Sequence, residues 1–228
     1  MGQHINLPTS GTQCIGAYLA RPEGKPRGGI VVIQEIFGVN AHIRSVADRL
    51  AAAGYVAVAP QFFDYLESGV EMDYNADTSG RGKALVNELG MDRAVEAVGS
   101  AAESIASAGK IGTVGFCWGG TVALLAAIRL GLPSVSYYGA RNLPFLDEPP
   151  MLHQGRRAPV MFHFGELDKS IPPEMVARHR EKLPQMEIYS YPADHAFNRD
   201  IGVQYHEPSA TLAWDRSMGF FARELAGA

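Results

Sequence analysis

The sequence contains little cysteine: only Cys14 and Cys117 occur among its 228 residues. Small secreted domains that rely on disulfides in place of a large core need more cysteines than this. Cys14 falls in an N-terminal strand pattern and Cys117 in a tight turn, so we expect both to be free thiols in a reducing cytoplasm. The opening residues Met1–His4 also lack the charged-then-apolar order of a secretory signal.

Long apolar runs and blocks of one charge are missing as well. The apolar runs are of strand length or are broken by Gly and Arg, so none approaches a membrane span. The formal net charge is -4 without any basic block, so we expect neither nucleic acid nor a membrane as a partner. The hydrophobic content of 46% is typical of a soluble globular protein. No repeat, low-complexity tract or linker interrupts the chain, and we expect one domain over residues 1–228.

Strand and helix patterns alternate along the chain, which predicts an α/β fold with a mostly parallel, twisted sheet flanked by helices on both faces. The expected strands are Ile30–Gln34, Tyr55–Ala59, Lys110–Phe116, Val135–Tyr138, Val160–Phe164 and Met186–Tyr191. The expected helices are Ile43–Leu50, Lys83–Ala108, Gly119–Leu130 and Pro208–Leu225. Gln61–Ser79 is irregular, and is either a lid over a site or a solvated connector, while Arg141–Arg157 is a Pro-rich loop.

The most informative motif is Gly115-Phe116-Cys117-Trp118-Gly119-Gly120, which lies between an apolar strand and a helix. A reactive side chain flanked by small residues at such a junction is typical of the G-x-S-x-G nucleophile elbow, here with sulfur in place of oxygen. The following helix directs its N-terminus at the site, where it stabilises a thiolate and offers amide hydrogens to an oxyanion. The alternative is a glycine-rich turn that holds an inert buried cysteine.

A thiol nucleophile needs a base, and that base needs an acid that orients it. Downstream of Cys117, Asp168 follows one buried strand and His195 follows the next, which is the chain order of α/β hydrolases. The carboxyl ends of parallel strands meet at one edge of a sheet, so we expect the three side chains to converge. His195 would accept the thiol proton, and Asp168 would fix its tautomer. The alternatives are a turn-capping Asp168 and a packing or surface His195.

Two other histidines compete for the role of the base. His163 lies inside an apolar strand, and we expect it to be a core histidine with satisfied hydrogen bonds. His179 lies between two arginines, and we expect it on an exposed helix. Neither position favours catalysis as strongly as that of His195.

A carboxylate at Glu35 ends the buried apolar run Ile30–Gln34, where it would be costly to desolvate without a partner. At the carboxyl end of that strand it would lie near the elbow, where it can modulate the ionisation of the thiol. The alternative is a structural salt bridge. The backbone N–H groups of Ile36 and Trp118 are the expected oxyanion hole.

Three motifs of the chain together resemble the dienelactone hydrolase (carboxymethylenebutenolidase) family. They are the cysteine elbow given above, Gln34-Glu35-Ile36-Phe37-Gly38 and His195-Ala196-Phe197-Asn198-Arg199. The resemblance extends over nearly the whole chain and includes Tyr137-Tyr138-Gly139. A cysteine elbow coupled to a glutamate in Q-E-I-F-G is far more specific than a hydrolase elbow alone.

This resemblance implies roles for further residues. Glu35 would be a switch that holds the resting thiol neutral until substrate binding moves the glutamate and a thiolate forms. Two arginines would bind a substrate carboxylate: Arg199 matches the H-x-F-x-R pattern, and Arg81 is the candidate for the other. Tyr138 would also contact the substrate. Leu85 stands where well-studied members have a pocket tyrosine, so one polar contact would be missing.

The function implied by the resemblance is hydrolysis of small cyclic enol esters, in which Cys117 attacks the lactone carbonyl and forms an acyl-thioester. For dienelactone the product would be maleylacetate, a step in the catabolism of chlorinated aromatics. We expect a monomer without cofactor or metal, acting on an ester or lactone that carries a carboxylate. The alternatives are a broader esterase of the same family and a non-catalytic binding protein that retains the fold. No paired ligand spacing supports a metal site, and no C-x-x-C motif supports redox chemistry.

Overall fold

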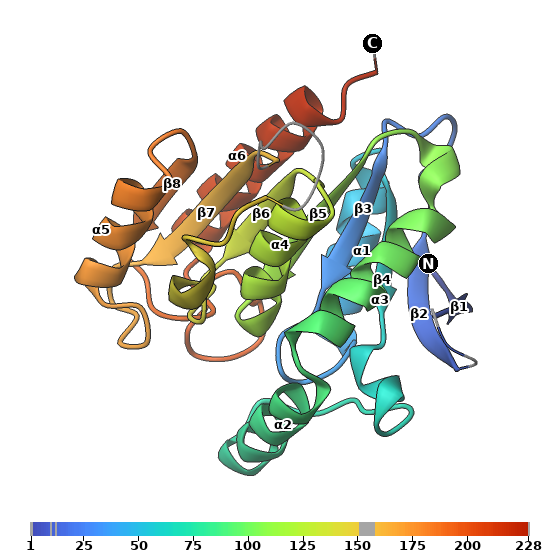
Figure 1. Ribbon diagram of the computed structural model, residues 1–228, viewed down its shortest axis with the longest axis horizontal. Helices are drawn as coiled ribbons and strands as arrows, with labels where there is room; N and C mark the ends of the chain where they lie inside the picture. Colours follow the sequence, from blue (N-terminus) through green and yellow to red (C-terminus); the bar gives the residue numbers. More distant parts are fainter. Residues whose placement is uncertain (1, 10, 12, 151–157, 228) are drawn as a thin grey trace.

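The computed structural model of the protein describes residues 2–9, 11, 13–150 and 158–227. Its strands are β1 Gln3–Pro8, β2 Cys14–Ala20, β3 Gly29–Ile33, β4 Val56–Pro60, β5 Ile111–Phe116, β6 Ser134–Tyr137, β7 Val160–Gly165 and β8 Glu187–Tyr191. They form an eight-stranded sheet in the order β1-β2-β4-β3-β5-β6-β7-β8 (Figure 1). All pairings from β4 to β8 are parallel, whereas β1 and β2 form an antiparallel edge. The prediction of a mostly parallel α/β sheet is therefore confirmed.

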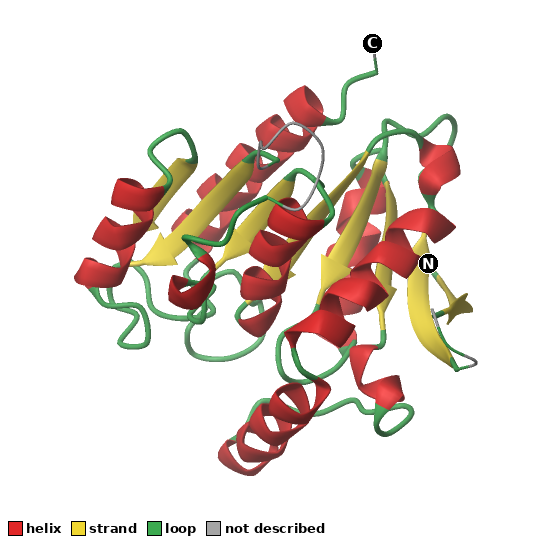
Figure 2. Cartoon of the chain, viewed as in Figure 1, coloured by secondary structure: helices red, strands yellow, loops and turns green. Residues whose placement is uncertain are grey.

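Helices cover both faces of this sheet (Figure 2). The α-helices are α1 Ala41–Ala52, α2 Ala76–Leu89, α3 Met91–Ser104, α4 Trp118–Arg129, α5 Pro173–Lys182 and α6 Glu207–Glu224. Helices α1 and α6 lie on one face, and α3, α4 and α5 lie on the other. Strand β3 shows why two faces are covered: Ile30 and Val32 pack with α1, whereas Val31 and Ile33 pack with α3. Within the described ranges, none of the helices is both long and apolar enough to span a membrane.

The expected helix Lys83–Ala108 is wrong, because the chain forms two helices there. Gly90 separates α2 from α3 with φ of 76°, a left-handed conformation that no helix interior accommodates. Helix α2 begins at Ala76, inside the segment expected to be irregular, and Asn75 caps it through a reciprocal capping box with Thr78. The same segment contains a 3-10 helix, Phe62–Tyr65. Helix α2 lies beyond the carboxyl ends of the strands, at the lower edge of Figure 1.

The elements beside β7 give one confirmation and one correction. His163 is fully buried on β7, as expected of a core histidine. His179 lies on α5, but it is fully buried as well, so its expected exposure is wrong. Its Nδ1 lies 2.8 Å from the Met175 carbonyl oxygen and its Nε2 lies 3.1 Å from Asn142 Nδ2, which pairs both ring nitrogens. The expected loop Arg141–Arg157 contains a 3-10 helix, Leu143–Phe145, and its residues 151–157 lie outside the described residues.

Candidate active site

The elbow forms where β5 ends at Phe116 and α4 begins at Trp118. Cys117 joins the two elements with φ of 54° and ψ of -116°, a conformation that is strained for any residue with a side chain. The turn is so tight that a Cβ atom on Gly115 would lie 1.9 Å from the carbonyl oxygen of Gly119. The backbone therefore holds the half-buried Cys117 side chain at the carboxyl end of the sheet.

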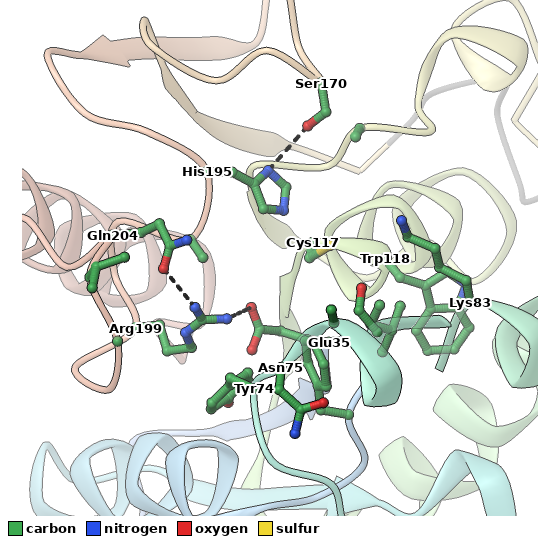
Figure 3. A pocket seen from close by; sticks show the side chains of 18 of the residues that line it. Glu35, Tyr74, Asn75, Lys83, Cys117, Trp118, Ser170, His195, Arg199 and Gln204 are labelled. Atoms are coloured by element: carbon green, nitrogen blue, oxygen red, sulfur yellow. Dashed lines mark hydrogen bonds and ion pairs between the residues drawn. The ribbon is translucent and has the colours of Figure 1, made fainter. Parts of the chain in front are cut away.

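His195 and Asp168 come together beside this cysteine. Nδ1 of His195 lies 2.6 Å from Oδ2 of Asp168, while the other carboxylate oxygen accepts hydrogen bonds from the amide and hydroxyl of Ser170 at 2.8 and 2.5 Å. The other ring nitrogen points toward Cys117 (Figure 3). The sulfur and the ring interact, because the charge of Cys117 and a side-chain hydrogen bond to it both act on the imidazole. The three residues expected to converge do so.

The ionised forms of His195 and Asp168 stabilise each other beside Cys117. Burial disfavours the charged imidazole, but the charge of the Cys117 sulfur and the bond to Asp168 outweigh it and raise the pKa of His195 well above its usual value. Burial also opposes ionisation of Asp168, but its bonds to His195 and Ser170 prevail and lower the pKa of that carboxyl. His195 is therefore equipped to hold a proton that Cys117 gives up, with Asp168 as its counter-charge.

Two backbone amides at the elbow are available to an oxyanion. Trp118 is the first residue of α4, where helix amides have no intrahelical acceptor. Within the described part of the chain, neither Trp118 N–H nor Ile36 N–H donates to a protein acceptor. The amide of Cys117 itself is occupied, because it donates to the Tyr137 carbonyl at 3.0 Å. These contacts are consistent with the expected oxyanion hole.

These groups open onto a cavity of about 700 Å³. Figure 3 shows Cys117 at its centre, between His195 and Glu35, with Arg199 on one side and Lys83 on the other. The residues that line it are Glu35, Ile36, Phe37, Tyr74, Asn75, Ala76, Ser79, Lys83, Cys117, Trp118, Ala140, Arg141, Ser170, His195, Ala196, Arg199, Gly202, Val203 and Gln204. Across the described ranges, no three His, Cys, Asp or Glu side chains are grouped so that they could hold a metal ion.

Glu35 and Arg199 face each other across one end of this cavity. Glu35 is 2% exposed, and its Oε1 lies 3.9 Å from Nη1 of Arg199, longer than a hydrogen bond. Nε and Nη2 of Arg199 donate to Ile201 O at 2.8 Å and to Gln204 Oε1 at 3.0 Å, and its guanidinium lies 3.9 Å from the centre of the Tyr74 ring. Of the five N–H groups of Arg199, the two on Nη1 and one on Nη2 are left for Glu35 or for a ligand.

Tyr74 is a site residue that the sequence analysis missed. Its hydroxyl exchanges hydrogen bonds with the Asn40 side chain at 2.9 and 3.2 Å. Burial, followed by the charge of Glu35, raises the pKa of Tyr74 far above its usual value, so the phenol stays neutral. The N-x-x-T capping pattern of Asn75 and Thr78 would have revealed a helix start directly after this tyrosine.

Two residues assigned to substrate binding by resemblance, Arg81 and Tyr138, lie outside the cavity lining, and so does Leu85, which stands where other members have a pocket tyrosine. Nη2 of Arg81 is bonded to both carboxylate oxygens of Glu67 at 2.6 and 2.7 Å on the exposed side of α2, and Arg81 does not line the cavity. Leu85 is half-buried against apolar neighbours and does not line it either. Tyr138 is fully buried, with its ring centre 5.1 Å from that of His195. The structure therefore does not place Arg81 or Tyr138 among the residues that line the cavity.

Comparisons with known proteins agree with this geometry. A family model described as the dienelactone hydrolase family matches residues 15–225. A carboxymethylenebutenolidase candidate of Salmonella typhi is 34% identical over 235 residues, which cover 96% of this chain and 86% of that protein. Carboxymethylenebutenolidase 1 of Cupriavidus pinatubonensis is 28% identical over 216 residues, or 91% of each chain. The crystal structure of a candidate dienelactone hydrolase from Klebsiella pneumoniae superposes with a TM-score of 0.82 at 31% identity, covering 98% of both chains.

Proposed function

Because the chain belongs to the dienelactone hydrolase family, we propose that it hydrolyses small carboxylate-bearing cyclic enol esters through an acyl-thioester at Cys117. Dienelactone is the model substrate and maleylacetate its product, which would place the reaction in aromatic catabolism in the cytoplasm, carried out by a monomer. The observation that carries this proposal is the convergence of Cys117, His195 and Asp168 on a cavity that also holds Arg199.

Binding begins at Arg199. A substrate carboxylate can bind at the Nη1 side of the guanidinium, which is the side that faces Glu35. The substrate and Glu35 therefore compete for the same cation. By resemblance, Glu35 then moves and helps to convert the thiol of Cys117 into a thiolate.

Acylation follows at the elbow. His195 takes the thiol proton, and the sulfur of Cys117 bonds to the lactone carbonyl carbon, whose oxygen becomes an anion held by the amides of Ile36 and Trp118. When the carbonyl re-forms, the ring C–O bond breaks and the leaving enol oxygen takes the proton from His195. The opened chain remains attached to Cys117 as a thioester.

Deacylation uses the same groups in reverse order. His195 takes a proton from water, the hydroxide bonds to the thioester carbonyl carbon, and the C–S bond breaks. The sulfur leaves as a thiolate and recovers its proton from His195. In sum, one lactone and one water give one open-chain acid, whose enol tautomerises to the ketone.

A broader carboxylesterase of the same family is the second candidate. The structure favours it in two ways: Arg81 is turned away from the cavity, and a cavity of about 700 Å³ is larger than a six-carbon lactone requires. A dienelactone kcat/KM no better than that for phenyl acetate would support this second function.

The test is steady-state hydrolysis of cis- and trans-dienelactone and of phenyl acetate by the wild type, Cys117→Ser, Cys117→Ala and Cys14→Ser. Cys14 is the matched control, because it is an exposed free cysteine on β2 outside the cavity. We expect Cys14→Ser to match the wild type, and both Cys117 variants to lose at least about 10³-fold in kcat. Near-wild-type turnover in the Cys117 variants would contradict the sulfur nucleophile and favour the non-catalytic protein or another mechanism.

A further inference from the structure

The cavity carries an excess of positive charge that the proposed chemistry does not use. Its acidic and basic lining residues are Glu35, Lys83, Arg141 and Arg199, although the chain as a whole has a formal net charge of -4. Glu35 and Arg199 face each other at 3.9 Å, which leaves Lys83 and Arg141 without a counter-charge in the cavity. A concave surface lined by one sign of charge concentrates ligands of the opposite sign.

Lys83 and Arg141 converge although they are far apart in the sequence. Lys83 and Asn87 are four residues apart on α2, so their side chains lie on the same face of the helix. Nη1 of Arg141 donates to Oδ1 of Asn87 at 2.8 Å, which brings its guanidinium to the turn next to Lys83. Ser79, one turn before Lys83 on that face, also lines the cavity.

No described carboxylate lies within ion-pair distance of either cation. Two neighbouring positive groups repel each other, and an anion bound between them is attracted to both and offsets that repulsion. Lys83 also lies on the side of Cys117 opposite Arg199 (Figure 3). The nucleophile therefore stands between two separate cationic regions of one cavity.

We propose that Lys83 and Arg141 form a second anion subsite, and that the substrate carries two anionic groups, one on each side of the reacting carbonyl. One is the carboxylate at Arg199, and the other is a carboxylate or phosphate at Lys83 and Arg141. This inference rests on the proposed cysteine hydrolysis and narrows its substrate class. A doubly anionic ester or lactone is then a better substrate than one with a single charge.

The test uses phenyl esters that differ only in where they carry charge. Phenyl acetate carries none, monophenyl succinate carries a carboxylate on the acyl side, 4-acetoxybenzoate carries one on the leaving group, and mono(4-carboxyphenyl) succinate carries both. An additional ester, 4-acetoxyphenyl phosphate, distinguishes a phosphate from a carboxylate at the second subsite. For each ester, the kcat/KM of the wild type is divided by that of the variant, which cancels differences in leaving-group reactivity.

The variants are Lys83→Gln, Lys83→Arg and the double variant Lys83→Gln/Arg141→Gln, with Lys25→Gln as the matched control on an exposed turn. We expect Lys83→Gln to lower kcat/KM about three- to fivefold for the doubly charged ester, the upper range for an exposed ion pair. The double variant should lose more, while phenyl acetate should be unaffected. Lys83→Arg and Lys25→Gln should behave like the wild type, and the preference for the doubly charged ester should shrink in 0.5 M salt.

Equal losses on all the esters, or no loss on either the doubly charged ester or the phosphate ester, would overturn the second subsite. A loss confined to the phosphate ester would identify phosphate as its occupant. Including Cys117→Ala in the same series separates this inference from the proposed function. If Cys117→Ala is inactive while Lys83→Gln shows no charge-dependent loss, only the subsite is wrong. If Cys117→Ala remains active, the proposed hydrolysis itself is wrong.

Discussion

Gly82 of helix α2 packs directly against Ile36, whose amide is part of the proposed oxyanion hole. A Cβ atom at position 82 would lie 2.1 Å from the carbonyl oxygen of Ile36 and 3.1 Å from both its carbonyl carbon and its Cβ. Gly80 is on the same helix, yet a Cβ atom there would meet nothing within 4 Å. Gly82→Ala and Gly80→Ala are therefore the same chemical change on one helix, and only the first presses on Ile36.

The size of the effect follows from these distances. Real Cβ contacts do not fall below 3.0 Å, so Gly82→Ala must separate α2 and Ile36 by about 0.9 Å. A misplacement of about 1 Å can cost roughly 10²-fold in rate, and loss of one oxyanion donor costs about 10²- to 10³-fold in kcat. We expect kcat to fall by about 10- to 100-fold for Gly82→Ala, with a smaller change in KM.

Stability separates this effect from a general loss of structure. Gly80→Ala should raise the free energy of unfolding by about 0.5 to 1 kcal/mol, because alanine is the better helix former. Gly82→Ala gains the same propensity but adds overpacking of about 1 to 3 kcal/mol, so its free energy of unfolding should fall. The assay is kcat and KM on a chromogenic ester, together with urea unfolding. A kcat for Gly82→Ala within twofold of that for Gly80→Ala would refute the claim that α2 positions Ile36.

Two further predictions concern protons and charge. Burial, with a smaller effect of the Arg216 charge, lowers the pKa of His163 to about 3. Below about pH 6.5, His163 is therefore protonated in the unfolded chain but stays neutral in the folded chain. The free energy of unfolding should therefore fall by about 2 kcal/mol more between pH 7 and pH 5 in the wild type than in His163→Gln, measured by urea unfolding; equal pH dependence would contradict this. Arg199→Gln should raise KM for monophenyl succinate but not for phenyl acetate, whereas Arg81→Gln should change neither KM. A raised KM for monophenyl succinate in Arg81→Gln would instead support the sequence-based assignment of Arg81 to the substrate carboxylate.

Features that depend on local chain geometry were predictable from the sequence. The continuous apolar run of β3 is typical of a strand covered on both faces, and the structure buries all of its residues. The elbow around Cys117 follows from glycines that no larger residue can replace at such a turn. Because Asp168 and His195 each follow a parallel strand, their convergence with Cys117 was also predictable.

Features that depend on long-range packing were not predictable. The close contact of Gly82 with Ile36 determines which side of α2 faces the cavity. With α2 in this orientation, Lys83 lines the cavity and Arg81 does not. The burial of His179 follows from the position of Asn142, a partner 37 residues away. The guanidinium of Arg199 packs on the ring of Tyr74, and no spacing in the sequence predicts such a contact.

The most direct measurement of the central claim is rapid-quench mass spectrometry of the protein during turnover of monophenyl succinate. We expect a transient succinyl adduct on the peptide that contains Cys117, none on the peptide that contains Cys14, and none in Cys117→Ala. Steady hydrolysis without an adduct, together with undiminished turnover in Cys117→Ala, would contradict catalysis through a thioester at Cys117.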